Sequence, residues 1–229
     1  MRTLQVTMGK NFAKPMIICL HASGGSGMQW KALADRVQHD FHVVAPDLYG
    51  HGIAPAWDGA SADIVVADAE RVARLAADAS GAVHLIGHSY GGAIALRVPL
   101  EDPERVASVA VYEPVTLRIL FDYNRNHRAA SEVAEITDNI RRALIGGNPE
   151  RAAERFVDYW AGEPQWARLT PERQASFARR MPVVLSHFVS LRNDAVRLRD
   201  YAKRHCSGSV FIRPRHAHVG TPHGGTVEL

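Results

Sequence analysis

The stretch VHLIGHSYGGAIALRV, residues 83–98, has the most informative pattern in this chain. It begins as an apolar run of strand length, passes through a turn rich in glycine, and continues into a helical pattern bearing Ala and Leu. Ser89 stands in the middle of that turn, within the pattern G-x-S-x-G at residues 87–91. Because a strand runs directly into the turn and a helix runs directly out of it, the stretch predicts a sharp turn that exposes the serine hydroxyl.

Apolar runs of strand length alternate with helical patterns over the first half of the chain. The runs are continuous rather than interrupted by polar residues, which is typical of parallel strands covered on both faces. The runs occupy 16–20, 41–45, 83–86 and 106–112, and the helical patterns occupy 30–38, 64–79 and 90–100. Strands that alternate with helices predict a doubly wound, mostly parallel α/β sheet.

The character of the chain changes between residues 115 and 202. Helical patterns rich in Arg and Glu follow one another there, separated by breaks that contain Gly and Pro, at 132–144, 149–160, 171–180 and 183–198. We therefore expect a helical cap at 115–202, inserted into an α/β core made of residues 1–114 and 203–229. The last part of the core contains one possible strand, 208–213, and then a tail rich in Pro, His and Gly.

Composition and charge exclude several classes of protein. The 229 residues are 46% hydrophobic and 22% charged, with a net charge of only +3, and no dense Lys/Arg run is present, so we expect no nucleic-acid partner. The chain has no apolar stretch of about 18 residues and no secretory signal, so we expect no membrane association. Two cysteines, Cys19 and Cys206, do not suggest a disulfide framework, and a cytoplasmic location is the simplest expectation.

Three loops that follow predicted strands carry a family resemblance. Their sequences are LHASGGSG (20–27), APDLYGHG (45–52) and VHLIGHSYGG (83–92). In order and spacing they resemble the α/β-hydrolase fold enzymes, and VYEPVTLRIL (111–120) resembles the junction between strand and cap in that family. Two departures are visible: Ala22 stands where the family usually has Gly, and Pro99 falls late in a helix that it should kink or end.

The resemblance implies hydrolysis by acyl transfer, with Ser89 as the nucleophile. The backbone N–H groups of Ser23 and Tyr90 would then form the oxyanion hole, which stabilises negative charge on the attacked carbonyl oxygen. The resemblance further implies structural roles, rather than catalytic roles, for Asp47 and His51. His21 and His51 lie beside the wrong strands for a base, so we expect both to hydrogen-bond loops near the site.

The acid and the base of such a triad follow the serine in the chain, in that order. The family usually places its acid after a strand that follows the cap, but this chain has no carboxylate between Asp200 and Glu228. Glu113, directly after the fourth predicted strand, is the available substitute; its alternative role is to line the pocket or cap a turn. His218 falls on the family's histidine when 210–220 is matched to its last strand and loop.

Two interpretations of the tail fit the sequence. In one, a βα unit that carries the usual acid has been lost, and His218 is the base. In the other, the strand at 208–213 precedes the missing acid, and the residues after it are foreign sequence, as a frame shift or a truncation would leave.

The leading hypothesis is serine-dependent hydrolysis of a small, largely apolar ester or related carbonyl compound. Its expected partner is that small-molecule substrate, and the sequence leaves the oligomeric state open. No cofactor is expected, and no metal, because the histidines do not cluster with carboxylates at ligand spacing. The alternative is a catalytically weak or inactive protein of the same fold that acts as a binding module, since the usual triad acid and final strand are missing.

Overall fold

The computed structural model describes residues 14–59, 63–123, 128–201, 207–211 and 226–228. The chain divides into two compact units: the first comprises Met1–Val115 and Val196–Leu229, and the second comprises Thr116–Ala195. The second unit is shorter than the cap expected at 115–202, because the short helix α8 (Leu198–Tyr201) belongs to the first unit.

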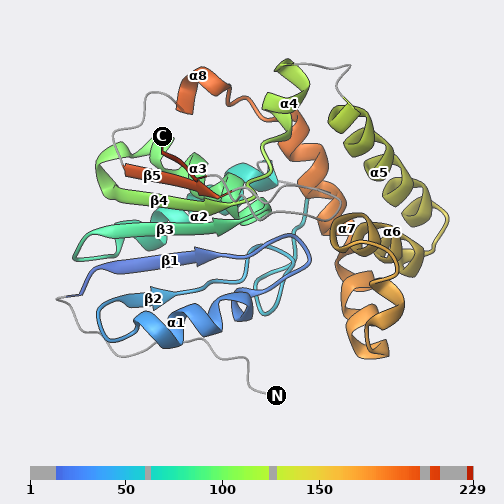
Figure 1. The fold of residues 1–229 in the computed structure, drawn as a ribbon, viewed down its shortest axis with the longest axis horizontal. Coiled ribbons are helices and arrows are strands. Elements are labelled where there is room, and N and C mark those ends of the chain that lie inside the picture. Colours follow the sequence, from blue (N-terminus) through green and yellow to red (C-terminus); the bar gives the residue numbers. More distant parts are fainter. Residues whose placement is uncertain (1–13, 60–62, 124–127, 202–206, 212–225, 229) are drawn as a thin grey trace. The chain divides into compact units, whose positions relative to one another are not determined.

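A six-stranded sheet forms the centre of the first unit, in the order β2-β1-β3-β4-β5-β6 (Figure 1). Five strands are parallel, and β6 is antiparallel to β5. Their bounds are Met16–Leu20 (β1), His42–Val44 (β2), Val83–His88 (β3), Val106–Tyr112 (β4), Ser207–Phe211 (β5) and Thr226–Glu228 (β6). The predicted doubly wound, mostly parallel α/β sheet is confirmed.

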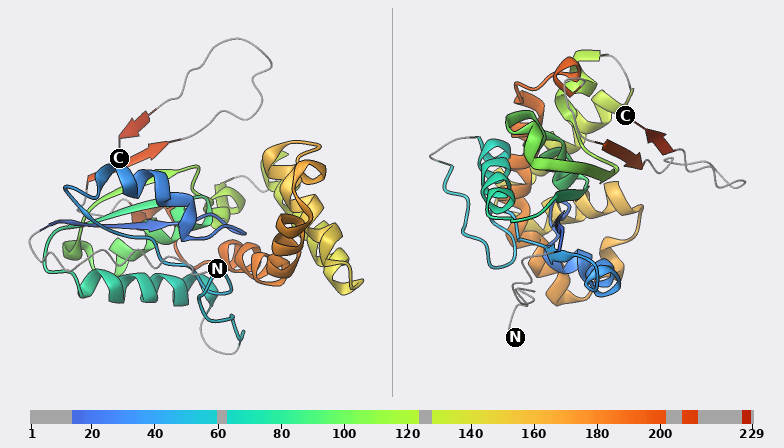
Figure 2. Two further views of the ribbon diagram at one scale, coloured as in Figure 1. Left: turned by 90° about the horizontal axis from the view of Figure 1, so that it is seen from below. Right: turned by 90° about the vertical axis from the view of Figure 1, so that its left-hand side faces the viewer.

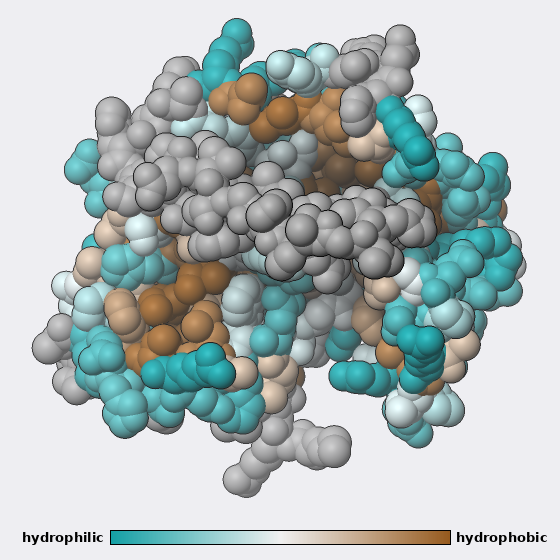
Figure 3. Space-filling model, viewed as in Figure 1, coloured by the Kyte–Doolittle hydropathy of each residue, from teal (hydrophilic) through white to brown (hydrophobic). Residues whose placement is uncertain are grey.

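Helices lie on both faces of this sheet. The short η1 (Gly27–Trp30) and α1 (Lys31–Val37) lie on one face, and α2 (Ile64–Ala77) lies on the opposite face beside α3 (Tyr90–Glu101), as Figure 2 shows. Hydrophobic side chains between α1 and the sheet form a small core. At the surface, Figure 3 shows hydrophobic residues in brown at the lower left. Its buried members are Ile17, Cys19, Ala34 and Val43.

The helix α3 continues past the proline that was expected to kink or end it. Pro99 lies inside α3, which extends to Glu101 before the 3-10 turn η2 (Pro103–Arg105). Proline lacks the N–H that would bond to the carbonyl four residues earlier, but only two helical residues follow it. The helix therefore does not end at the proline.

The second unit is helical over its described residues. Its elements are α4 (Leu117–Tyr123), α5 (Arg128–Ile145), α6 (Pro149–Ala161), the 3-10 turn η3 (Trp166–Arg168) and α7 (Pro171–Asn193). The prediction of two helices, 171–180 and 183–198, is wrong: α7 is one helix with Pro182 inside it. Met181 and Val184 are fully buried on either side of the proline, so an apolar stripe continues across it, and packing outweighs a local cost of about 3 kcal/mol.

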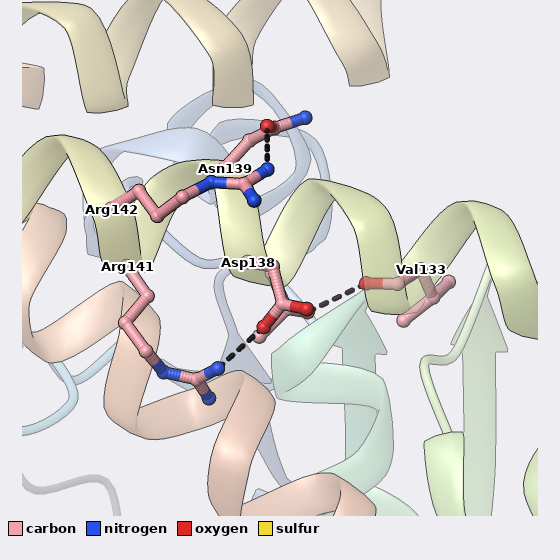
Figure 4. A network of polar contacts seen from close by, with 6 residues as sticks. Val133, Asp138, Asn139, Arg141 and Arg142 are labelled. Carbon is pink, nitrogen blue, oxygen red and sulfur yellow. Dashed lines mark hydrogen bonds and ion pairs between the residues drawn. The ribbon is translucent and has the colours of Figure 1, made fainter.

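The helix α5 has one apolar face and one charged face. Val133, Ile136 and Ile140 are buried. On the polar side Arg141 pairs with Asp138 and Arg142 donates to Asn139, as Figure 4 shows. These neighbours three residues apart stabilise the helix from its solvent face. None of the helices in the described part of the chain is both long and apolar enough to cross a membrane.

Candidate active site

Ser89 lies between β3 and α3 in a backbone conformation that residues other than glycine rarely adopt, with φ 53° and ψ −115°. Such a conformation costs about 1–3 kcal/mol and persists only where the surrounding structure fixes it. Three backbone hydrogen bonds do so. The Ser89 N–H donates to the Tyr112 carbonyl (3.0 Å), and the Ser89 carbonyl accepts from the N–H groups of Ala93 (3.1 Å) and Val115 (3.2 Å).

The glycines on either side of Ser89 are required by close backbone approaches. A Cβ at Gly91 would lie 2.3 Å from the Leu20 carbonyl oxygen, and a Cβ at Gly87 would lie 2.3 Å from the Gly91 carbonyl oxygen. Both neighbours are backbone carbonyl oxygens, so neither can move away unless the chain itself moves. The G-x-S-x-G pattern therefore describes a turn in which α3 packs directly on the end of β1.

The strand order brings the loops after β1 and β3 to one edge of the sheet. The chain passes from β1 to β2 on one side of β1 and returns to β3 on the other side, so the strand order reverses at β1. Leu20 and Gly87 are register partners, so both loops begin side by side. In open parallel sheets, ligands bind outside the carboxyl ends of the strands at this point of reversal.

Backbone N–H groups of the loop after β1, residues 21–27, make one hydrogen bond to a side chain of η1 and one within the loop. The Ala22 N–H donates to Gln29 Oε1 (3.1 Å), and the Gly25 N–H donates to the Ala22 carbonyl (2.9 Å). These bonds form a tight turn around Ser23. The backbone N–H of Ser23 is the predicted oxyanion donor of this loop, and the loop lies at the same edge of the sheet as Ser89.

The loop after β2 is bonded to the loop after β1 at three points. The Gly24 N–H donates to His51 Nε2 (3.0 Å), the Leu48 N–H donates to His21 Nε2 (3.0 Å), and the Gly27 N–H donates to an Asp47 carboxylate oxygen (2.8 Å). The expected loop-holding contacts of Asp47, His21 and His51 are therefore present.

Sequence reasoning missed Asp68, a fully buried carboxylate on α2. It accepts from the Tyr90 hydroxyl at 2.8 Å and from the Tyr49 N–H at 3.0 Å, so it connects α2, the residue after Ser89 and the loop after β2. Burial raises the pKa of Asp68 to about 6, against the opposing effect of these hydrogen bonds and of Arg71. The available signal was an acidic residue on the apolar face of α2, next to Ala69.

Glu113 and Ser89 occupy equivalent places on adjacent strands. His88 and Tyr112 are register partners at the ends of β3 and β4, and Ser89 and Glu113 directly follow them. Glu113 is half-buried and has a positive φ of 46°. The structure therefore brings Glu113 to the same edge of the sheet as Ser89.

His218, the predicted base, lies outside the described residues. The imidazole of His88, adjacent to Ser89 in the chain, packs against the Tyr112 ring with a centroid separation of 5.2 Å, and its Nδ1 lies 3.1 Å from Gln29 Nε2. Within the described ranges no group of three or more His, Cys, Asp or Glu side chains is placed to hold a metal ion.

Relatives of this chain include proteins that are named as a lipase and as a hydrolase. The chain is 29% identical over 147 residues to lipase LipV of Mycobacterium tuberculosis, covering 63% of this chain and 51% of the relative. It is 25% identical over 159 residues to the (E)-2-((N-methylformamido)methylene)succinate hydrolase of Acinetobacter baylyi, covering 69% of this chain and 54% of the relative. The chain thus spans about half the length of these curated relatives.

The crystal structure of an alpha/beta hydrolase from Sphaerobacter thermophilus has the same fold, with a TM-score of 0.63 at 16% identity, over 87% of this chain and 75% of that one. The model of the Alpha/beta hydrolase family matches residues 17–227, which include the strand–serine–helix turn and the loops bonded around it. On this match the chain belongs to the alpha/beta hydrolase family.

Proposed function

We propose that this protein is a serine hydrolase that cleaves a small, largely apolar ester or a related carbonyl compound. Ser89 is the nucleophile, and the backbone N–H groups of Ser23 and Tyr90 form the oxyanion hole. Glu113 is the acid and His218 is the base.

One observation carries this proposal: the strained backbone of Ser89, fixed by three hydrogen bonds at the point where the strand order reverses. Strain of this kind is kept where it positions a functional group. Tyr90 is the first residue of α3, so its N–H lies at the N-terminus of that helix. The helix N-terminus also favours negative charge, as an oxyanion requires.

The chemistry follows from these placements. The Ser89 oxygen attacks the carbonyl carbon while the histidine accepts the hydroxyl proton, and the negative charge collects on the carbonyl oxygen. The tetrahedral intermediate collapses, the bond to the leaving alcohol breaks, and the histidine returns its proton to that alcohol. Water then attacks the acyl-enzyme by the same route, which releases the carboxylic acid and restores Ser89.

The names of the relatives support a carbonyl substrate. One is named as a lipase and the other as a hydrolase of a substituted succinate.

A specific observation favours a second candidate, a weakly active or inactive protein of this fold that binds its ligand. No carboxylate occurs between Asp200 and Glu228, where the family's acid is expected. Without a working acid and base, the oxyanion hole and binding alone supply about 10³–10⁴ over the reaction in water.

The test is turnover of p-nitrophenyl acetate and butyrate, together with covalent labelling by a fluorophosphonate. Ser89→Ala should lower turnover at least about a thousandfold and abolish labelling. The matched control is Ser131→Ala, at an exposed serine on α5, which should leave both unchanged. Turnover and labelling that are equally absent from wild type and Ser89→Ala would favour the binding protein.

His218→Ala and Glu113→Gln assign the other two roles. Each should lower kcat while leaving KM nearly unchanged, because the acid and base act in the transition state. Full activity of His218→Ala, with loss of activity in Ser89→Ala, would contradict the assignment of the base.

A further inference from the structure

The side chain of Tyr90, the residue after Ser89, is anchored inside the first unit by a carboxylate on another helix. The Tyr90 hydroxyl donates to Asp68 Oδ2 at 2.8 Å. Tyr90 is 1% exposed and Asp68 is completely buried, so bulk water does not compete for this bond. An ionised carboxylate can only accept a hydrogen bond, so the hydroxyl has to point at Asp68 and the bond has a single direction.

The second oxygen of the same carboxylate holds the loop after β2. Asp68 Oδ1 accepts from the Tyr49 N–H at 3.0 Å. Arg71, one turn further along α2, donates to the Asp47 carbonyl at 2.8 Å, and its guanidinium lies 5.5 Å from the centre of the Tyr49 ring. These contacts between α2 and the loop fix Asp68 in place, so it can serve as a rigid anchor for Tyr90.

The start of α3 has few side chains that could set its rotation. Gly91 and Gly92 have none, and a Cβ at Gly91 would lie 2.3 Å from the Leu20 carbonyl oxygen. From residue 89 to residue 93, Tyr90 alone carries a large side chain. Its N–H and its Cβ belong to one residue and flank the same Cα, so a ring that is held in place also limits rotation of the N–H.

We propose that Asp68 is a positioning residue for the reaction: its carboxylate holds the Tyr90 side chain and thereby directs the Tyr90 N–H at the oxyanion. The inference rests on the proposed function, because the direction of this N–H matters only if it receives the oxyanion. Asp68 acts only through Tyr90. A donor that is directed before the reaction begins stabilises the transition state without reorganisation, so loss of the anchor should lower kcat and leave KM nearly unchanged.

Three variants separate the hydrogen bond from the charge and from the ring. Tyr90→Phe keeps the ring and removes the hydroxyl. Asp68→Leu removes both acceptor oxygens, whereas Asp68→Asn removes the charge but can still bond to the Tyr90 hydroxyl and to the Tyr49 N–H. Val43→Ala, in the core on the opposite face of the sheet, controls for loss of stability alone. Tyr123→Phe, at an exposed tyrosine on α4, controls for loss of a tyrosine hydroxyl.

The first readout is the kinetics of p-nitrophenyl ester hydrolysis. Tyr90→Phe and Asp68→Leu should each lower kcat by about ten- to hundredfold with little change in KM, which is part of the roughly 10²–10³ that loss of an oxyanion donor costs. The double variant should lose no more than the worse single variant, because both changes break the same bond. Asp68→Asn should keep most of the wild-type kcat, and both controls should keep all of it.

The second readout is independent of activity. In nitrogen–proton NMR spectra, the amide signals of Ser89 and Tyr90 report the direction and surroundings of these N–H groups. Asp68→Leu should move both signals more than Asp68→Asn does, and Val43→Ala should leave both in place. If Asp68→Leu does not fold, Tyr90→Phe, a smaller change, provides the kinetic test in comparison with Tyr123→Phe.

In an active enzyme, three results would each overturn the inference: wild-type kcat in Tyr90→Phe, a loss in Asp68→Asn as large as in Asp68→Leu, and losses that multiply in the double variant. A wild-type protein without turnover and without labelling of Ser89 would overturn the proposed function. If its Ser89 and Tyr90 signals still responded to Asp68→Leu more than to Asp68→Asn, the anchoring of Tyr90 by Asp68 would be supported, and equal responses would overturn the anchoring too.

Discussion

Replacing Asp68 by asparagine removes a buried negative charge and can preserve both of its contacts. The amide oxygen can accept from the Tyr49 N–H, and the amide NH₂ can donate to the Tyr90 hydroxyl oxygen, where the carboxylate now accepts from both groups. We therefore expect Asp68→Asn to stabilise the protein at neutral pH, although the side chain is completely buried.

The magnitude follows from the two pKa values of the carboxyl group. Burial raises the pKa from 3.8 to about 6 in the folded protein, so the folded state binds this proton more tightly than the unfolded chain does. The stabilisation that the proton provides is complete below pH 3.8 and is lost as the pH rises through about 6. The difference between the two pKa values corresponds to about 3 kcal/mol in the free energy of unfolding. Asp68→Asn should therefore be more stable than wild type by about this amount at about pH 7.5.

The assay is unfolding in urea at intervals from about pH 4 to about pH 8, with the variant always compared with wild type so that other titrating groups cancel. The advantage of Asp68→Asn should grow from near zero to its full value across this range. Tyr90→Phe removes a hydrogen bond that lowers the pKa of Asp68, so it should move the pH dependence of wild type to higher pH. Asp40→Asn, at an exposed site, is the control.

A difference between Asp68→Asn and wild type that stays constant with pH would refute this reasoning. So would a variant that is less stable than wild type at about pH 8. The first result would mean that the hydrogen bonds from Tyr49 and Tyr90 offset the effect of burial on the pKa of Asp68, and the second would mean that the bonds of the carboxylate outweigh the cost of its burial.

Three further changes test the packing of the structure. Gly91→Ala puts a Cβ 2.3 Å from the Leu20 carbonyl oxygen, so urea unfolding should reveal a loss of at least about 1–3 kcal/mol and turnover should fall sharply. Cys19 is fully buried and burial raises its thiol pKa to about 12, so mass spectrometry should find it unmodified by iodoacetamide until the protein unfolds. Phe188 packs edge-on against Phe156 with centroids 6.3 Å apart, so Phe188→Ala should lower the stability of the second unit by about 3–5 kcal/mol in thermal or urea unfolding, and normal stability would contradict this packing.

The strands were predictable because their burial leaves a simple pattern. Met16–Leu20 and Val106–Tyr112 match β1 and β4 residue for residue. In a chain where such runs alternate with helical patterns, continuous apolar runs of this length have few structural interpretations other than buried parallel strands. The turn at Ser89 was predictable for a related reason, since close backbone contacts on both sides of the serine demand glycine.

Other structural features depend on contacts between residues distant in sequence, which a local sequence pattern does not reveal. The single helix α7 contradicts the local preference of Pro182, because buried residues on both sides of the proline pack together with the rest of the second unit. Asp68 acquires its importance from Tyr90 and Tyr49, which are distant in sequence. The short strand β6, at Thr226–Glu228, lies in a tail whose composition resembled a loop.

The position of β1 in the sheet has a consequence for synthesis of the chain. β1 is made before both of its neighbours, β2 and β3, and its partner Val83 follows Met16 only after α1, β2 and α2 have been made. Until β3 leaves the ribosome, one edge of the apolar run Met16–Leu20 has no strand to pair with, and such an edge recruits other unfinished chains. The strand order that brings Ser89 beside the loop of Ser23 therefore also leaves one edge of β1 open to aggregation during translation, until β3 has been made.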